Sequence, residues 1–178
     1  MAVEIVQNGH PVLREIAKAI PIKDIQSEKV QKILKDMSKA LASQDDGVAI
    51  AAPQIAVALR IFTISGRVFD DEFIRGEKNL KEKKHKDVVC INPIFKKVSK
   101  DKKLMAEGCL SVRPLYGKVR RATRATIEAY DAEGIKFTLD GTGLLAHIFQ
   151  HEIDHLDGIL FIDKAKDIHE SDGEGEFS

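Results

Sequence analysis

Apolar residues repeat at helical spacing between residues 27 and 43. Ser27 precedes the repeat and suits a helix N-terminus, because its hydroxyl can accept a hydrogen bond from a free backbone N–H. The apolar positions recur three or four residues apart and so share one helix face: Val30, Ile33, Leu34, Met37, Ala40 and Leu41. We therefore expect an amphipathic helix here. The earlier segment "HPVLREIAKAI" is expected to form a short turn or helix with Pro11 near its first position.

Four later segments have the residue types and alternation of β-strands. They are residues 59–65, 88–99, 103–112 and 124–141, and the last contains a "DAEG" turn between two alternating runs. Pro93 cannot donate a backbone hydrogen bond, so it indicates a bend or an edge position within its strand. The segment "GVAIAAPQIAV", which begins at Gly47, is expected to be a loop or a strand that packs closely against its neighbours.

A second helix is expected from about Gly143 to Leu156, with Asp157-Gly158 as its stop signal. The following "ILFID" predicts a short strand. Residues 66–87 are charged and rich in lysine, which predicts a solvated loop or insertion. Residues 164–178 form an acidic tail that is expected to fray.

The order of these elements indicates an α+β fold. We expect mostly antiparallel sheets packed around the C-terminal helix, together with the N-terminal amphipathic helix. A length of 178 residues is typical of one compact domain. We therefore expect a single domain over residues 1–163, followed by the tail over 164–178.

Composition changes this picture little. The 28 Lys and Arg residues balance the 28 Asp and Glu residues, so no overall field favours nucleic acid or an anionic membrane as a partner. The N-terminus lacks the apolar run of a secretory signal, and no stretch reaches transmembrane length, so a cytoplasmic protein is expected. Two cysteines, Cys90 and Cys109, favour free thiols or a metal ligand over a disulfide.

The expected C-terminal helix contains the pattern H-E-x-x-H. His151 and His155 are four residues apart and so lie on one helix face, where two imidazoles can bind the same metal ion. Glu152 lies about 100° around the helix, within reach of a water bound to that ion. The pattern predicts a metal site, although such a string also occurs by chance, with surface or capping histidines.

A catalytic metal needs a third protein ligand and an open position. Downstream of His155 the acidic candidates are Asp163 and two glutamates in the tail, Glu170 and Glu174. Cys109 in "EGCLS" is the better candidate, because a thiolate with two imidazoles suits zinc or ferrous iron. The alternative for Cys109 is a small buried thiol without a ligand role, which is also our reading of Cys90.

Three segments, in this order and at suitable separation, resemble the motifs of peptide deformylases: "GVAIAAPQ" (47–54), "EGCLS" (107–111) and "QHEIDHLDG" (150–158). "GHPVLREIAKAI" and "ILFID" also resemble the opening and closing stretches of that family, so the similarity runs from about residue 5 to residue 163. The resemblance implies a hydrolase that removes the N-formyl group from the initiator methionine of new polypeptides and releases formate.

The resemblance also implies a role for each matching residue. One divalent metal ion would be held by Cys109, His151 and His155, with Fe²⁺ as the native metal and Zn²⁺, Ni²⁺ or Co²⁺ able to occupy the site. Glu152 would be the general base and later the acid. The side-chain amide of Gln54 and the backbone N–H of Leu110 would stabilise charge on the formyl oxygen.

Substrate recognition is expected to combine strand addition beside Val48 and Gly108 with an apolar pocket for the methionine side chain. The expected substrate-binding residues are Gly47, Val48, Ala49, Gly108, Leu144, His147 and Ile148. Three positions depart from the family's usual pattern: Ala49 replaces a glycine, Arg113 precedes a delayed Pro114, and His147 lies one turn before His151. His147 is either an extra ligand or, as we favour, part of the pocket wall.

The expected partner is the nascent formyl-methionyl polypeptide at the ribosome, bound by a monomeric enzyme without a membrane or direct nucleic-acid site. Two alternatives remain open. A metallopeptidase of the H-E-x-x-H kind would differ in its third ligand. A non-catalytic binder of formylated N-termini would not need the general base Glu152 or the amide of Gln54.

Overall fold

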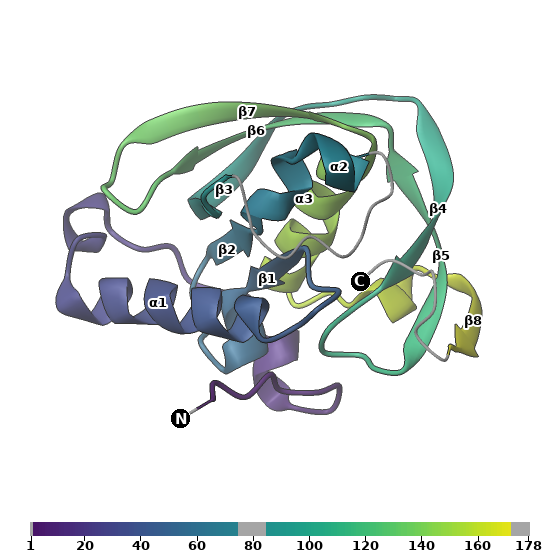
Figure 1. The fold of residues 1–178 in the computed structure, drawn as a ribbon, viewed down its shortest axis with the longest axis horizontal. Helices are drawn as coiled ribbons and strands as arrows, with labels where there is room; N and C mark the ends of the chain where they lie inside the picture. Colours follow the sequence, from purple (N-terminus) through teal and green to yellow (C-terminus); the bar gives the residue numbers. More distant parts are fainter. Residues whose placement is uncertain (1, 75–84, 172–178) are drawn as a thin grey trace.

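A five-stranded and a three-stranded sheet, both antiparallel, make up the β structure of the described residues (Figure 1). The computed structural model describes residues 2–74 and 85–171. The larger sheet has the order β1 (Ala49–Ala51), β2 (Ile61–Ile64), β3 (Val88–Val98), β6 (Arg124–Tyr130) and β7 (Lys136–Thr142). The smaller sheet has the order β4 (Lys102–Gly108), β5 (Leu115–Ala122) and β8 (Lys166–Glu170). The expected α+β class is confirmed.

The N-terminal amphipathic helix is α1 (Glu28–Ala42), and Ser27 caps it by accepting a hydrogen bond from the Val30 N–H at 3.3 Å. Its apolar face packs against one side of the larger sheet. Side chains alternate between the two sides of a strand, so Ile50, Ile61 and Ile91 face α1 in the first core cluster. Their chain neighbours Ala49, Ala51, Phe62 and Cys90 face the other side, in a second cluster.

The second helix, α3 (Gly143–Leu156), fills that other side of the sheet. Figure 1 shows α3 near the centre of the molecule, with β6 and β7 above it and β4 and β5 to its right. The expected stop signal is confirmed, because Gly158 has a φ of +73° and a Cβ there would lie 2.6 Å from the Arg14 carbonyl oxygen. Only glycine suits this backbone and this close approach.

Short 3₁₀ turns connect these elements: η1 (Pro11–Arg14), η2 (Ile22–Asp24), η3 (Ala52–Ile55), η4 (Gly66–Phe69) and η5 (Phe161–Asp163). The expected turn at Pro11 is thus confirmed, and "GVAIAAPQIAV" divides into β1 and η3. Pro93 does mark a bend, because the register of β3 against β6 shifts between Ile91 and Ile94. The edge position is wrong, since β3 lies between β2 and β6.

Three other expectations need correction. Residues 66–74 are η4 followed by α2 (Asp71–Ile74), and Val68 is buried in the core, so this part is not a solvated loop. Residues 75–84 of the expected insertion lie outside the described residues. "ILFID" ends in the turn η5 rather than a strand, because its apolar side chains Leu160 and Phe161 pack into a third cluster with Val12 and Val119.

The tail expectation is also wrong in part. Residues 166–170 form β8, which pairs with β5 through Leu115↔Glu170 and Tyr116↔His169. The side chains of β8 are exposed, so apolar periodicity could not reveal the strand. Backbone pairing to β5 stabilises it instead, and Gly117 allows the approach, because a Cβ there would lie 2.9 Å from that of Ala165. Residues 172–178 lie outside the described residues.

Candidate metal centre

Two histidines one helical turn apart project from α3 toward the end of β4. The rings of His151 and His155 meet edge to face, with centroids 4.9 Å apart, as expected for positions i and i+4. Cys109 directly follows β4, and its Sγ lies 3.2 Å from Nε2 of His155. One ligand atom from each of the three residues lies within 4.8 Å of the other two. The structure thus brings together the three residues that the resemblance implies as metal ligands.

The chemistry of this donor set fits a divalent transition metal. A thiolate and two imidazoles suit zinc or ferrous iron, and three protein ligands leave a position open, as in catalytic sites. Nδ1 of His151 is bonded to Glu107, so Nε2 is left as the ligand atom. Burial, reinforced by His151, holds the pKa of His155 well below its usual value, which favours the neutral imidazole that binds a metal. Burial acts to lower the pKa of His151 too, but the charge of Glu107 outweighs it and raises that pKa well above its usual value, so His151 must release a proton to bind a metal.

The buried carboxylate of Glu107 binds three side chains at once. Its Oε1 accepts a hydrogen bond from Nδ1 of His151 at 2.5 Å, and its Oε2 accepts one from Nε2 of His147 at 2.7 Å. Arg121 donates to both oxygens, at 2.6 and 3.0 Å. Burial acts to raise the pKa of Glu107, but the charge of His151 and these hydrogen bonds outweigh it and lower the pKa well below its usual range. An ionised Glu107 therefore fixes the ring of a candidate ligand.

Arg121 extends this network toward the C-terminal segment. Its Nη1 donates to Asp154 on α3 at 2.7 Å, and Nζ of Lys164 lies 3.0 Å from both oxygens of Asp154. Burial acts to lower the pKa of Arg121, but Glu107 and Asp154 raise it above its already high value. The guanidinium thus stays charged while buried, and it links the smaller sheet to the helix that carries both histidines.

Sequence reasoning missed the parts played by Glu107 and Arg121. The charged type of each residue predicts a solvated side chain, because Glu and Arg are rarely fully buried unless paired. One signal was available: Arg121 lies on β5 two residues after the apolar Val119, so the two side chains share the buried side of the strand, while Arg120 between them is exposed. The pairing itself depends on the register of β4 against β5 and on the position of α3.

Replacement of Glu107 by glutamine is expected to weaken metal binding about 10- to 100-fold, the usual cost of losing an outer partner of a ligand histidine. A glutamine amide has one acceptor oxygen and no charge, so it cannot accept hydrogen bonds from all three partners. The buried positive charge of Arg121 then lacks the negative charge of Glu107, and the free energy of unfolding should fall by about 3 kcal/mol. Chelator competition and denaturant unfolding measure the two effects. The matched control is Glu128→Gln, which breaks only pairs to the exposed Lys96 and Lys136 and should cost under about 1 kcal/mol. Equal losses in the two variants would contradict the assignment.

Glu152 lies between His151 and His155 in sequence, and its side chain is buried. Among the described residues, no hydrogen-bond partner faces its Oε2. Burial raises the pKa of Glu152 to about 7, although the charge of His151 acts to lower it. A carboxyl group with a pKa near neutrality can both take up and release a proton.

Gln54 and Leu110 offer two hydrogen-bond donors beside Cys109. Oε1 of Gln54 accepts from the Ala51 N–H at 2.8 Å, which turns the amide NH₂ toward Ser111 Oγ at 3.1 Å and Cys109 Sγ at 3.6 Å. The backbone N–H of Leu110 makes no hydrogen bond to any residue that the structure describes. Both donors are therefore positioned next to the candidate metal ligands before any substrate binds.

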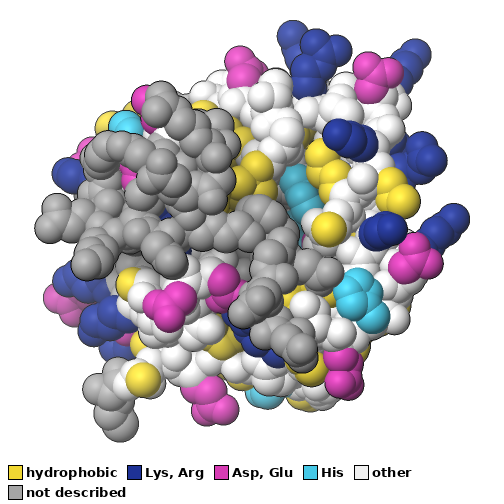
Figure 2. All heavy atoms as spheres, turned by 45° about the vertical axis from the view of Figure 1, so that its right-hand side comes forward, with side chains coloured by type: hydrophobic (Ala, Val, Ile, Leu, Met, Phe, Trp, Pro, Cys, Tyr) yellow, Lys and Arg dark blue, Asp and Glu magenta, His cyan; other side chains and the backbone are white. Residues whose placement is uncertain are grey.

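A pocket that opens to solvent adjoins the histidines. Figure 2 shows a hollow on this side of the molecule, where a histidine side chain lies among hydrophobic ones. The pocket is lined by Val48, Glu107, Gly108, Leu144, His147, Ile148, His151 and Glu152. Five of the seven expected substrate-binding residues thus line this pocket, and Gly47 and Ala49 do not.

Ala49 and His147 were two of the departures from the family pattern. Ala49 lies in the extended strand β1, outside the residues with positive φ, so its methyl group causes no backbone strain there. Its side chain packs in the core. His147 donates to Glu107 and is not part of the group formed by the three donors. The pocket-wall interpretation therefore fits the structure better than an extra ligand.

Two strand edges lie beside the pocket. β1 is the outer strand of the larger sheet, and β4 is the outer strand of the smaller sheet. Val48 directly precedes β1 and Gly108 ends β4, and both line the pocket. Unpaired edges of this kind can bind an extended peptide by adding it as a further strand.

The downstream acidic candidates for a third ligand are placed elsewhere. Asp163 pairs with Arg14, with oxygen-to-nitrogen distances of 2.5 and 3.1 Å. Glu170 lies at the end of β8, opposite Leu115, and Glu174 lies outside the described residues. Among the residues described, the only group found that could hold a metal is the one containing Cys109.

A family model described as polypeptide deformylase matches residues 2–171. The peptide deformylase of Desulfitobacterium hafniense is 39% identical over 164 residues, which cover 92% of this chain and 94% of that protein. Peptide deformylase 1A, chloroplastic/mitochondrial, of Arabidopsis thaliana is 40% identical over 163 residues, but this chain spans only 60% of its length. A class I type b peptide deformylase from Acinetobacter baumannii, with Met-Ala-Ser bound, matches the fold with a TM-score of 0.78 at 28% identity, over 92% of this chain and 99% of that one.

Proposed function

The chain belongs to the polypeptide deformylase family, and we propose that it hydrolyses the N-formyl group of formyl-methionyl polypeptides and releases formate. The observation that carries this proposal is the convergence of Cys109, His151 and His155 next to the buried carboxyl of Glu152. The chain spans about 60% of the length of the plant relatives, and 94% of the length of the bacterial relative from Desulfitobacterium hafniense.

Members of this family depend on a metal ion, and the described residues offer one group that fits it. Cys109, His151 and His155 would hold the ion, and Fe²⁺ is the native metal that we propose, with Zn²⁺, Ni²⁺ or Co²⁺ able to replace it. When bound, a divalent metal supplies Lewis acidity, which makes water easier to deprotonate and the formyl carbonyl more electrophilic.

The residues around the donors have separate tasks in the proposed reaction. Glu152 takes the proton of the attacking water on its carboxylate and later delivers a proton to the leaving amine nitrogen. As charge develops on the formyl oxygen, the amide NH₂ of Gln54 and the N–H of Leu110 stabilise it. Their preset orientation supports this role, since such donors are typically worth about 3–4 kcal/mol each in the transition state.

The substrate backbone is proposed to lie as an extended strand beside Val48, which precedes β1, and Gly108, which ends β4. The methionine side chain enters the pocket formed by Val48, Leu144, His147 and Ile148. Gly47 and Ala49 take part through the backbone near β1, because their side chains are absent or buried in the core. Main-chain pairing does not depend on sequence, which suits an enzyme that acts on many nascent chains.

We further propose that the enzyme acts as a cytoplasmic monomer on polypeptides still at the ribosome. Residues 1–163, with β8 added to their smaller sheet, would act as one catalytic domain. Among the described residues, no helix combines the length and the apolar character needed to cross a membrane.

Two other functions are less well supported. A metallopeptidase with a downstream acidic third ligand has less support, because Cys109 lies beside both histidines and Asp163 is paired with Arg14. A binder of formylated N-termini would gain nothing from Glu152, a buried carboxyl group whose Oε2 has no partner among the described residues.

The direct test is formate release from formyl-Met-Ala-Ser by protein purified without oxygen and loaded with Fe²⁺. We expect turnover that stops when the metal is removed by a chelator and returns when it is restored. Acetyl-Met-Ala-Ser serves as the control substrate. If fully loaded protein releases no formate, the proposed activity on this substrate is wrong.

A further inference from the structure

Charge is distributed very unevenly along this neutral chain. The segment from Lys96 to Arg124 carries ten Lys and Arg residues and two Asp and Glu residues, for a net charge of +8. The rest of the chain carries 18 basic and 26 acidic residues, for a net charge of −8. Within the segment, the pair formed by Glu107 and Arg121 is buried and cancels itself. The neutral total therefore conceals a concentrated positive region.

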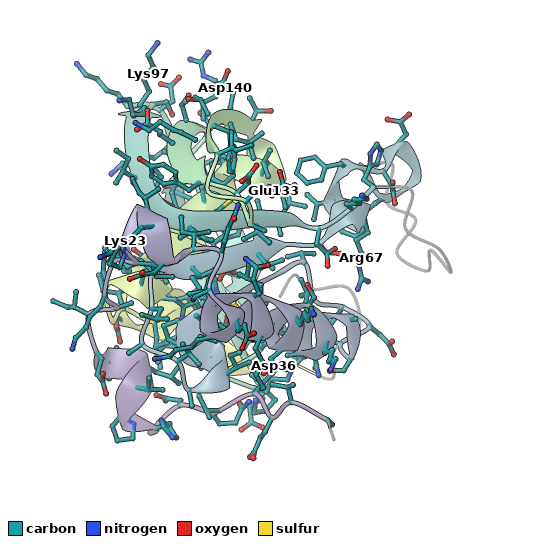
Figure 3. The ribbon with its side chains drawn as sticks, turned by 90° about the vertical axis from the view of Figure 1, so that its left-hand side faces the viewer. Lys23, Asp36, Arg67, Lys97, Glu133 and Asp140 are labelled. Carbon is teal, nitrogen blue, oxygen red and sulfur yellow. The ribbon has the colours of Figure 1, made fainter. Side chains whose placement is uncertain are left out.

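The positive region covers the end of β3, strands β4 and β5, and the start of β6. Figure 2 shows Lys and Arg side chains projecting on this side of the molecule, next to the hollow with the histidine. We use the name basic surface for its six exposed members that make no ion pair with any other described residue: Lys97, Lys100, Lys102, Lys103, Arg120 and Arg124. Figure 3 shows Lys97 pointing outward at the same end of the molecule as Asp140.

Nearby acidic groups compensate this charge only in part. Asp101 lies within the segment, and Asp140 is hydrogen bonded by Thr126 at 2.6 Å. Lys118 on β5 lies directly opposite Lys166 on β8, and like charges in opposed positions destabilise a sheet. Lys118 also contacts the exposed Asp167 at 3.8 Å, and an exposed pair of this kind stabilises by less than about 1 kcal/mol. An anionic partner would relieve the repulsion between the two lysines.

The charges lie on both sides of the β4–β5 ribbon. Arg120 points outward from β5 opposite Leu104, so the neighbouring outward position on β4 is Lys102. Lys103 is opposite Arg121 and so points to the other side of the ribbon, where it is also exposed. A flat membrane surface would contact one side only, whereas a nucleic-acid backbone can follow both. Tyr116 is the one aromatic residue between Lys96 and Arg124, and it is buried, so the contacts suit phosphates rather than stacked bases.

We propose that the basic surface, centred on Lys102, Lys103 and Arg120, binds the phosphate backbone of RNA beside the active-site pocket. The choice of RNA over DNA rests on the proposed function, because a nascent polypeptide is still attached to the RNA-containing machinery that made it. Binding through phosphates is independent of sequence and falls steeply with salt.

The test uses the metal-loaded full chain and a fluorescently labelled RNA hairpin, with binding followed by anisotropy between 50 and 300 mM salt. We expect the logarithm of the binding constant to fall linearly with the logarithm of salt, by about 0.7–0.9 per phosphate contact. The triple variant Lys102→Gln, Lys103→Gln, Arg120→Gln should reduce this slope by about 2–3 and weaken binding at least about tenfold at 100 mM salt. The matched control neutralises three exposed lysines of α1, with Lys29→Gln, Lys35→Gln, Lys39→Gln, and should bind RNA like the parent protein.

Three results would overturn the proposal. These are equal loss of RNA binding in the two triple variants, tighter binding to phosphatidylglycerol vesicles than to RNA, or displacement of RNA by a tenfold lower concentration of duplex DNA. Thermal unfolding verifies that both variants are folded. Formate release from formyl-Met-Ala-Ser is measured in parallel and should be unchanged in the β4–β5 variant. A failure of RNA binding is thereby distinguished from a failure of the proposed function.

Discussion

Replacement of Cys109 by alanine is expected to abolish both metal retention and formate release. The variant removes one of the three proposed ligands, and two imidazoles alone bind iron or zinc more weakly than two imidazoles with a thiolate. The loss should therefore exceed the 10- to 100-fold expected for Glu107→Gln, which leaves all three ligands in place. Metal content per chain, determined after gel filtration without oxygen, is the direct measurement.

The second cysteine provides a matched control for this variant. Cys90 is also a buried free thiol, but it lies in the core between β2 and β6 and outside the group of donors. Burial raises the pKa of Cys90, so its thiol stays protonated and is a poor ligand. Cys90→Ala should lose some stability to a small cavity but keep its metal. A Cys109→Ala protein that retains a full equivalent of metal and its activity would disprove the proposed ligand set.

Replacement of Glu152 by glutamine should abolish most of the turnover but leave metal binding intact. The amide has the same shape but cannot carry the proton, so turnover should fall about 10²- to 10⁴-fold while the metal content stays unchanged. Stability should stay the same or rise, because the buried Oε2 has no partner among the described residues and a neutral group costs less to bury.

The comparison of Glu107→Gln with Glu152→Gln separates positioning from catalysis. The first variant should recover much of its activity when excess metal is supplied, since its main defect is weaker binding. The second should not recover at any metal concentration. Full activity of metal-loaded Glu152→Gln in steady-state assays would show that another group moves the proton.

The sequence predicted the parts of the fold that depend on local pattern. Helix α1 follows from its apolar repeat and its serine cap, and α3 from an apolar run that ends at Gly158. Strand β8 could not be predicted in this way, because its side chains are all exposed and its stability comes from backbone pairing with β5. The apolar "ILFID" was wrongly predicted to be a strand. Its side chains are buried, but they pack against Val12 and Val119 from a turn, without strand pairing.

For the site, too, the sequence predicted what depends on local pattern and missed what depends on contacts between distant segments. The H-E-x-x-H spacing predicted that His151 and His155 share one helix face, and the resemblance to peptide deformylases implied Cys109 as their partner; the structure brings the three together. The spacing could not predict that Glu107 would hold two histidines and an arginine, because that contact joins β4, β5 and α3 across distances of 14 to 44 residues in the chain. Net charge likewise concealed the basic surface, because a sum over the chain contains no information about position.

Helix α3 limits which positions of this chain can change during evolution. It carries both histidines and Glu152, and its remaining faces are packed in the core or against β5 and β7. Few of its positions can therefore mutate without affecting folding or chemistry. Evolutionary change in substrate preference should accumulate instead where the chain tolerates it, at the ends of β1 and in the segment after Cys109. Ala49 and Arg113, both of which differ from the family's usual residues, lie in those two places.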